Sequence, residues 1–482
     1  MLPIQNNLKN PARAALLLFT LLLAGAFLFY RERMIIDAAY VSFHIIHKYT
    51  LQIQANRYGS FITQLVPWAA AKLHLPLKTI LVGYSASFNV FYLLGAWILY
   101  RVRQYELVIL MSLYFTLYVS DTYFWTNNEL HQGVCWMFLM FGLMLQGRLQ
   151  ARTRPAQVGY YCLFTLLAFL SIYTHPTVMI PMGYLWGFYI LQKDRFRFSI
   201  KEIIAHSAVF AGIILFKMLS SLQHSYDGAN IRKLKHVNIY DVLDTFSSGL
   251  ADRFWKGCLH NYWLLPLLFI ASIYILVKER RYLLLTWTIG CNLAFFIVSC
   301  IVFDGSGKPF YVESEFMPYA ILGCTSFVYF LLPELRRPRP VYLLSFIFVV
   351  RLVYIGLSAN TFIERRLDIE RMISYMQHNG IRKMIIPQNP VMTQQLQETW
   401  ALPHESLYLS LLQGDSARTV ICRNESEMAQ LDVGNTRENF LDPFGPMRRD
   451  DFEHHYYFRP DMTSNYQVVP YHVITGKPDG TE

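Results

Sequence analysis

The stretch AALLLFTLLLAGAFLFYRERMIID, residues 14–37, decides the fold class, because no charged residue interrupts it between Ala14 and Tyr30. At 1.5 Å of helical rise per residue, about 20 such residues cross the roughly 30 Å of hydrocarbon in a bilayer. The composition agrees, since 54% of the 482 residues are hydrophobic and only 16% are charged. Soluble domains usually carry about 25% charged residues. We therefore expect an integral membrane protein and exclude a soluble globular one.

Apolar blocks of similar length recur as far as residue 358. We expect an α-helical polytopic membrane protein with about eleven membrane-spanning helices, near residues 14–30, 79–100, 105–120, 130–147, 157–174, 176–192, 202–222, 262–277, 282–303, 317–333 and 340–358. Arg and Lys gather in alternate connections, which predicts a cytoplasmic N-terminus, an extracytoplasmic C-terminus and a multi-pass inner (plasma) membrane location. These loops account for much of the net charge of +10, so the excess of basic residues does not indicate that the protein binds nucleic acid.

The chain is expected to have two domains, a transmembrane domain over residues 1–359 and a soluble extracytoplasmic (periplasmic) domain over residues 360–482. In the tail, residues 369–378 predict a helix that stops at Asn379-Gly380. Residues 384–386 predict a short strand before a proline. The C-terminal domain is therefore expected to be a small α/β domain.

The first outer connection, residues 31–78, contains two stretches with apolar residues at helical spacing, which predict two interfacial helices. Asp37 lies at its start, seven residues after Tyr30, where a carboxylate can meet a lipid-borne headgroup. A glycosyl transfer needs a base that takes the acceptor proton, or a carboxylate that orients the acceptor. Asp37 suits this catalytic role. Asp37 could instead be a solvent-exposed carboxylate of the loop or the N-cap of the next helix.

Asp37 after the first span, two interfacial helices, long later outer connections and a soluble outer tail together resemble the GT-C superfamily of polyprenyl-phosphate-dependent glycosyltransferases. The resemblance is architectural and covers residues 1–359. It implies a GT-C-like fold, a polyprenyl-linked sugar donor and a glycan, lipid or protein acceptor, with Asp37 at the matching catalytic position. Such enzymes commonly carry an acidic pair there. The segment from Arg31 to Ala38 has a lone Asp, which leaves donor and metal use open.

A second carboxylate, Glu129, is expected at the outer mouth of a span, where it could bind a sugar hydroxyl or a divalent cation. Thr126 and Glu129 also have capping-box spacing, so Glu129 could instead begin the helix. His175, in an outer turn before Pro176, could contact phosphate or hold the turn. The cysteines form no cluster with metal-ligand spacing, so we predict no structural zinc site.

Further substrate-binding candidates are acids of a later outer connection and cations on the outer side. They are Arg57, Arg232, Lys233, Lys235, Asp304, Glu313 and Glu315. The cations could neutralise a phosphate leaving group or bind anionic membrane lipids. Arg351 lies inside the last apolar block, where a charge costs about 2.5–3.5 kcal/mol on insertion scales. We expect Arg351 to face the bundle interior, either in an ion pair or in a substrate site.

These features together favour an integral membrane glycosyltransferase that moves a sugar from a polyprenyl-phosphate-type donor to an envelope lipid, glycan or protein acceptor on the outer face. Asp37 would activate or orient the acceptor, and outer cations would stabilise the departing phosphate. An envelope lipid or glycan transporter or flippase is the principal alternative, although the chain shows no internal repeat. A non-catalytic assembly protein is a third reading, but eleven spans exceed what an anchor needs.

Overall fold

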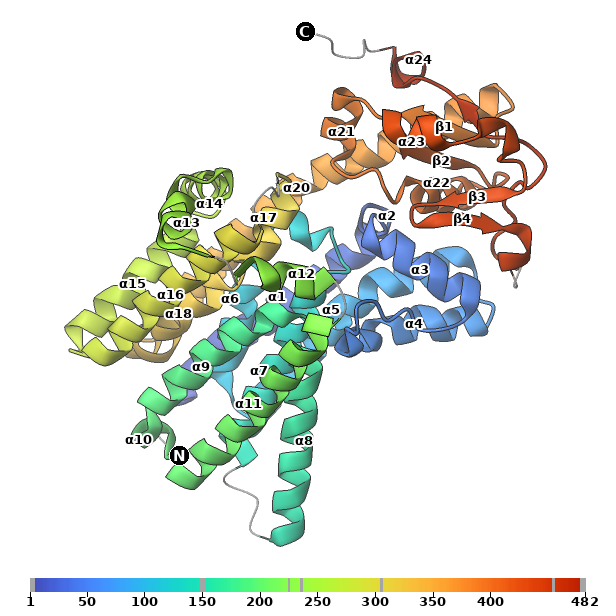
Figure 1. Ribbon diagram of the computed structural model, residues 1–482. Coiled ribbons are helices and arrows are strands. Elements are labelled where there is room, and N and C mark those ends of the chain that lie inside the picture. The colour runs from blue at the N-terminus through green and yellow to red at the C-terminus, as the bar shows by residue number, and fades with distance from the viewer. Residues whose placement is uncertain are drawn as a thin grey trace.

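The computed structural model describes residues 5–147, 153–223, 226–234, 237–303, 307–452 and 456–476. These residues form a helical bundle with a small α/β domain at one end, opposite the N-terminus (Figure 1). Each predicted apolar block coincides with a helix of the bundle. These helices are α1 (Gln5–Leu28), α5 (Leu77–Arg101), α6 (Tyr105–Tyr114), α7 (Glu129–Gly147), α8 (Arg154–Ile172), α9 (Met179–Leu191), α11 (Ile200–Gln223), α15 (Leu264–Lys278), α16 (Tyr282–Val302), α18 (Tyr319–Ser326) and α20 (Arg339–His378).

Among the described residues, six helices are long and apolar enough to cross a membrane, and the number reaches eight if each of two bent helix pairs is one span. One pair is α14 (Gly249–His260) with α15, bent by 86°. The other is α17 (Pro309–Phe316) with the helical segment from Tyr319 to Glu334, bent by 44°. These helices are consistent with a multi-pass membrane protein.

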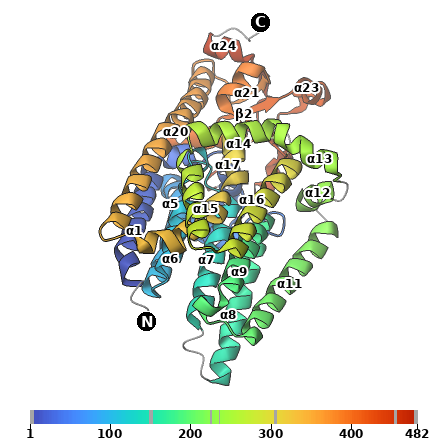
Figure 2. The ribbon, with the colours of Figure 1, turned by 90° about the vertical axis from the view of Figure 1, so that its left-hand side faces the viewer.

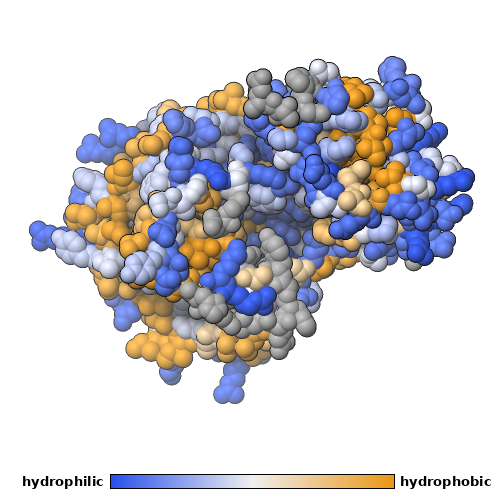
Figure 3. Space-filling view, turned by 45° about the horizontal axis from the view of Figure 1, so that its top comes forward, coloured by the Kyte–Doolittle hydropathy of each residue, from blue (hydrophilic) through white to orange (hydrophobic). Residues whose placement is uncertain are grey.

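The outer face of α20 shows what surrounds the bundle. Four apolar residues at helical spacing are 55–60% exposed, namely Phe346, Val349, Val353 and Leu357. The opposite face is buried, with Ile347 at 1% and Phe348 at 3% exposed. An exposed apolar stripe of this kind fits contact with lipid better than contact with water. Hydrophobic residues cover much of the bundle, whereas hydrophilic residues dominate the C-terminal domain (Figure 3).

The first outer connection contains the two expected helices. They are α3 (Asp37–Lys48) and α4 (Phe61–Lys72). α3 is not the surface helix we expected, because every residue from Ala38 to His47 is buried. The C-terminal domain covers it, with Phe43 in ring contact with His404 and Phe440 at 4.6 and 5.5 Å between ring centroids. Protein rather than lipid therefore buries the apolar side of α3.

The C-terminal domain is built on a three-stranded parallel sheet in the order β2-β1-β5. Its central strand contains the predicted strand at residues 384–386. The strands are β1 (Lys383–Pro387), β2 (Thr419–Arg423) and β5 (Gln467–Val468). An antiparallel pair, β3 (Asn439–Asp442) and β4 (Gly445–Arg448), forms a second sheet. The remaining helices are α21 (Pro390–Leu396), α22 (Leu402–Leu412), α23 (Glu425–Gln430) and α24 (Tyr471–Thr475).

The predicted domain boundary after residue 359 falls inside α20, which continues from Arg339 to His378. The predicted helix end at His378 is confirmed. In the bundle α20 contacts α1, and the two helices run side by side in Figure 2. Its last turns belong to the α/β core, where Met372 and Met376 pack with Met384 of β1. One helix therefore connects the two parts of the protein.

Candidate functional site

Asp37 is the first residue of α3, the helix that lies beside the C-terminal domain in Figure 1. The residue before it, Ile36, has a φ of 51°, in a region that β-branched residues rarely adopt. The backbone amide of Ile36 donates a hydrogen bond to Oε1 of Glu405 in α22 at 3.0 Å. Glu405 also accepts from Nη2 of Arg365 at 2.8 Å, and both charged side chains are buried. A buried ion pair therefore holds the strained turn that places Asp37.

Asp37 is half-buried. Trp125 donates its indole N–H to Oδ2 of Asp37 at 2.6 Å. Burial and the negative charge of Glu129 raise the pKa of Asp37 to about 7, against the opposing effects of the Trp125 hydrogen bond and the positive charge of Arg57. A carboxyl group with a pKa near neutrality can take up or release a proton at physiological pH, as general acid–base catalysis requires.

Arg57 and Glu129 form an ion pair next to Asp37. Nη1 of Arg57 lies 3.0 Å from Oε2 of Glu129, and the side chains are 13% and 15% exposed. The hydroxyl of Thr126, the other member of the predicted capping box, donates to the backbone oxygen of Arg33 at 3.1 Å. The Glu129 side chain is thus engaged with a cation. The fold therefore brings together three of the site residues predicted from the sequence, namely Asp37, Arg57 and Glu129.

Both parts of the protein border this set of residues. Tyr311 of α17 makes an edge contact with the Trp125 ring, at 5.1 Å between ring centroids. Lys308, just before α17, forms an ion pair with Glu398 of the C-terminal domain. The negative charge of Glu398 also acts on Asp37. The surroundings of Asp37 are therefore complete only when the C-terminal domain is docked.

We call Asp37, Arg57, Trp125 and Glu129 the Asp37 cluster. It offers a carboxylate that can accept a proton, a guanidinium that can bind phosphate oxygens in a fork, and an indole ring whose face can contact a sugar. The oxygens of Asp37 and Glu129 are also of the ligand type that divalent cations such as Mg²⁺ prefer. Arg57 already neutralises Glu129, which weakens the case for a cation there.

Arg33 organises the turn that carries Trp125, and the sequence did not single it out. Its guanidinium is buried and donates to the backbone oxygen of Tyr123 at 2.5 Å and to Oδ1 of Asn89 at 2.7 Å. It also donates to Oγ of Ser85 at 3.0 Å. The available signal was an Arg directly after the first span. Its partners come from α5 and from a turn about 90 residues later, so the sequence could not reveal them.

Glu313 and Arg351 hold one turn, residues 119–122, from two sides. The Glu313 carboxylate accepts the backbone amides of residues 120–122 at 2.7–3.0 Å, and the Tyr262 hydroxyl also donates to it. Arg351 donates to the backbone oxygens of Thr116 and Val119 at 2.8 and 2.9 Å. Arg351 is 1% exposed, so its predicted interior position is confirmed. Among the described residues, Arg351 donates hydrogen bonds to backbone oxygens and a hydroxyl rather than to the expected carboxylate.

Glu315 lies in a different environment. It is buried, and its Oε2 has no hydrogen-bond partner in the part of the chain that the structure describes. The charges of Arg253 and Lys233 act on it. Lys233 donates from Nζ to the backbone oxygen of Val302 at 2.6 Å, and Arg232 is exposed. Glu315, Arg253 and Lys233 therefore form a group of their own, apart from the contacts that join the Asp37 cluster.

His175 precedes the 3-10 turn Pro176–Val178 and acts as its N-cap. Its Nδ1 accepts the backbone amide of Thr177 at 3.3 Å, which supports the structural reading of this histidine. Two further predicted site residues, Lys235 and Asp304, lie outside the described residues.

Comparison of the chain with protein-family models, with curated proteins and with solved structures finds no match.

Proposed function

We propose that this protein is an integral membrane glycosyltransferase that moves a sugar from a polyprenyl-phosphate-type donor to an envelope lipid, glycan or protein acceptor on the outer face of the membrane. The observation that carries the proposal is the Asp37 cluster. In it, a half-buried aspartate with a pKa near neutrality lies next to a guanidinium, at the junction of the bundle and the C-terminal domain. Perturbed carboxylates of this kind concentrate at functional sites.

The chemistry assigned to the cluster is an inverting displacement. Asp37 takes the proton of the acceptor hydroxyl while the hydroxyl oxygen attacks the anomeric carbon of the sugar. The bond between that carbon and the phosphate oxygen breaks, and the phosphate leaves with the electron pair. Arg57 would neutralise the charge that develops on the phosphate, and Trp125 would orient Asp37 through its indole N–H.

The membrane arrangement proposed for this reaction has eleven spans. The eight candidate spans, with each bent pair as one, account for most of them, and α6, α7 and α9 are the additional, shorter or less apolar ones. The basic connections place the N-terminus in the cytoplasm and the C-terminal domain outside an inner (plasma) membrane. The Asp37 cluster would then face the outer leaflet, where a lipid-linked sugar and an envelope acceptor can meet.

The test compares Asp37→Asn with the wild-type protein in a strain that lacks the chromosomal copy. The amide keeps the size of the side chain but cannot take a proton, so transfer should fall by about 10²–10⁴-fold. The matched control is Asp252→Asn, which makes the same change at a side chain that is 56% exposed on α14. Envelope-glycan analysis and assay of the purified proteins with a polyprenyl-phosphate sugar provide the measurements. Wild-type turnover by Asp37→Asn would remove Asp37 from the mechanism.

Lipid analysis of the deletion strain separates a transferase from a flippase. A transferase defect should leave the lipid-linked sugar on the outer leaflet, accessible to reagents added from outside. A flippase defect should leave it on the cytoplasmic leaflet, and that result would overturn the proposal.

A further inference from the structure

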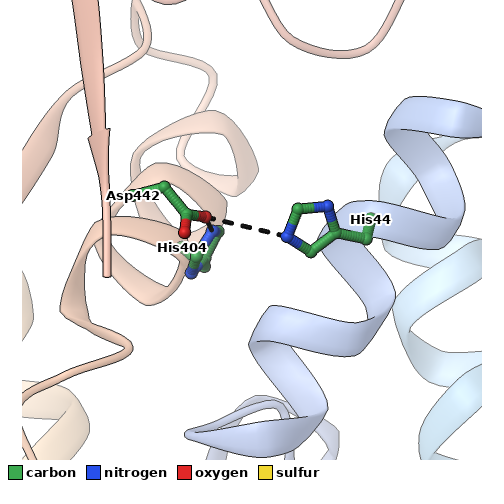
Figure 4. A group of neighbouring side chains, drawn as sticks. All are labelled: His44, His404 and Asp442. Carbon is green, nitrogen blue, oxygen red and sulfur yellow. Dashed lines mark hydrogen bonds and ion pairs between the residues drawn. The ribbon is translucent and has the colours of Figure 1, made fainter. Parts of the chain in front are cut away.

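His44, His404 and Asp442 form a buried cluster where α3 meets the C-terminal domain (Figure 4). His44 belongs to α3, His404 to α22 and Asp442 to the end of β3. One nitrogen or oxygen atom from each residue lies within 4.8 Å of the other two. Three segments that are distant in the sequence thus bring metal-ligand atoms to one point.

The environment of His44 is incomplete without a further partner. This side chain is 6% exposed, and neither ring nitrogen has a hydrogen-bond partner among the described residues. Its Nε2 lies 3.7 Å from Oδ2 of Asp442, which is too long for a hydrogen bond. A buried polar group that lacks its hydrogen bond costs about 1–3 kcal/mol. The geometry therefore points to another atom between these two residues.

The distances fit a metal ion at that position. Nε2 of His404 is hydrogen-bonded at 3.1 Å to the same carboxylate oxygen that His44 faces. In a tetrahedral zinc site with bonds of about 2.0–2.1 Å, neighbouring ligand atoms are roughly 3.3 Å apart. The two observed nitrogen–oxygen distances lie on either side of that value. We propose that His44, His404 and Asp442 bind one Zn²⁺ ion.

The surroundings favour a structural zinc site over a catalytic one. Two imidazoles and one carboxylate with a water molecule are the ligand set typical of catalytic zinc sites, so the structural assignment rests on the burial of the site. The rings of Tyr40 and Phe43 lie 4.5 and 5.3 Å from the His44 ring, and all three ligands are buried. Such an aromatic enclosure keeps a large substrate away from the ion and leaves the fourth position for a water molecule.

The ion would link the C-terminal domain to α3, the helix that begins with Asp37. His404 is adjacent in α22 to Glu405, which holds the backbone of Ile36. A second bond between the same helices joins the hydroxyls of Ser42 and Tyr408 at 2.9 Å. The zinc site would thus fix α3 two turns beyond Asp37, while Glu405 fixes the start of the helix.

The sequence predicts no structural zinc site, because its cysteines do not have the spacing of metal ligands. The ligands found here come from separate parts of the chain and show no motif spacing. Only the docking of α22 and β3 on α3 brings them together.

The experiment measures metal binding by the full chain in detergent, after removal of bound metal with a chelator. Co²⁺ is titrated first, because its visible absorption bands report tetrahedral coordination, and Zn²⁺ is then added to displace it. We expect one Co²⁺ per chain, displacement by Zn²⁺, and a higher melting temperature with either metal. No sugar donor is involved, so failure of this proposal and failure of the proposed transferase are distinguishable.

Three variants make the test specific. His44→Gln and Asp442→Asn should each lower the affinity for Co²⁺ by at least about tenfold. His47→Gln is the matched control, since His47 is a buried histidine one turn along the same helix whose Nε2 contacts the backbone oxygen of Asp451 at 2.7 Å. It should bind Co²⁺ like the wild type. Equal binding by His44→Gln and His47→Gln, or no tetrahedral Co²⁺ spectrum in the wild type, would overturn the proposal.

Discussion

The backbone amide of Ile36 donates a hydrogen bond to the carboxylate of Glu405, a residue 369 positions later in the chain. This bond joins the first turn of α3 to the C-terminal domain at the residue before Asp37. Because the Glu405 carboxylate also binds Arg365 of α20, three elements converge on one buried acid. The orientation of Asp37 consequently depends on the docking of a domain that begins more than three hundred residues later.

Loss of the Glu405 charge should disturb both stability and turnover. Glu405→Gln can still accept a bond from Ile36 but leaves the buried Arg365 charge unpaired, which typically costs about 3–5 kcal/mol. We expect a clearly lower melting temperature and reduced transfer by the folded fraction. The control is Glu334→Gln, which makes the same change at a side chain that is 45% exposed in its ion pair with Lys278 and should cost under about 1 kcal/mol. Equal melting temperatures of the two variants would contradict the stabilising role of the Glu405–Arg365 ion pair.

The Arg351 side chain should be essential for folding. Arg351→Leu removes the donors to the backbone oxygens of Thr116 and Val119 and leaves them buried without these partners, at about 1–3 kcal/mol each. We expect a strongly reduced yield of monodisperse protein. Arg339→Leu, at an exposed position at the start of the same helix, is the matched control and should behave like the wild type. Size-exclusion chromatography in detergent provides the measurement, and normal yield and melting of Arg351→Leu would refute this prediction.

The pH dependence of turnover should follow the ionisation of Asp37. Since the pKa of Asp37 is raised to about 7 and the base must be ionised, kcat/KM should rise with pH and level off above about 7. Glu129→Gln removes a negative charge that raises this pKa, so the profile should move to lower pH. Arg57→Gln removes a positive charge that lowers it, so the profile should move to higher pH. Shifts in the same direction for both variants would exclude this assignment.

The same ionisation should appear in the stability of the protein. Asp37 has a pKa of about 7 in the folded chain and an ordinary value of 3.8, so the folded state binds the proton more tightly. The free energy of unfolding should therefore fall as pH rises between about 4 and 7, by at most about 4 kcal/mol. Asp37→Asn cannot ionise. Its melting temperature should equal that of the wild type at pH 4 and exceed it at pH 8. The same difference in melting temperature at both pH values would contradict the raised pKa of Asp37.

The proposed orientation has a direct test. A reporter that is active only in an oxidising, non-cytoplasmic compartment should be active when fused after residue 482, because the basic connections predict that the tail lies outside. The same reporter in the basic connection at Lys278–Arg281 should be inactive. Activity at the second position but not at the first would reverse the topology.

The helices were predictable because each depends on a local property. Apolar runs of bilayer length mark the bundle, and the short strand at residues 384–386 is framed by polar residues and a proline. Asp37 and Glu129 were found because each lies at the end of an apolar block. Their proximity in space was not predictable, since it depends on how α3 and α7 pack.

The residues that position the Asp37 cluster could not be identified from the sequence. Arg33, Trp125 and Glu405 act through partners that are distant along the chain, and each is an ordinary residue in its own segment. The burial of α3 was missed for a related reason. An amphipathic helix looks the same whether lipid or another domain covers its apolar face.

The unbroken course of α20 has a mechanical consequence. Its 40 residues correspond to about 60 Å of helix, roughly twice the hydrocarbon thickness of a bilayer. The helix is therefore a rigid connection that fixes the distance and the rotation of the C-terminal domain relative to the bundle. In the proposed transferase, this fixed geometry would limit acceptors to molecules whose reactive group can reach the Asp37 cluster.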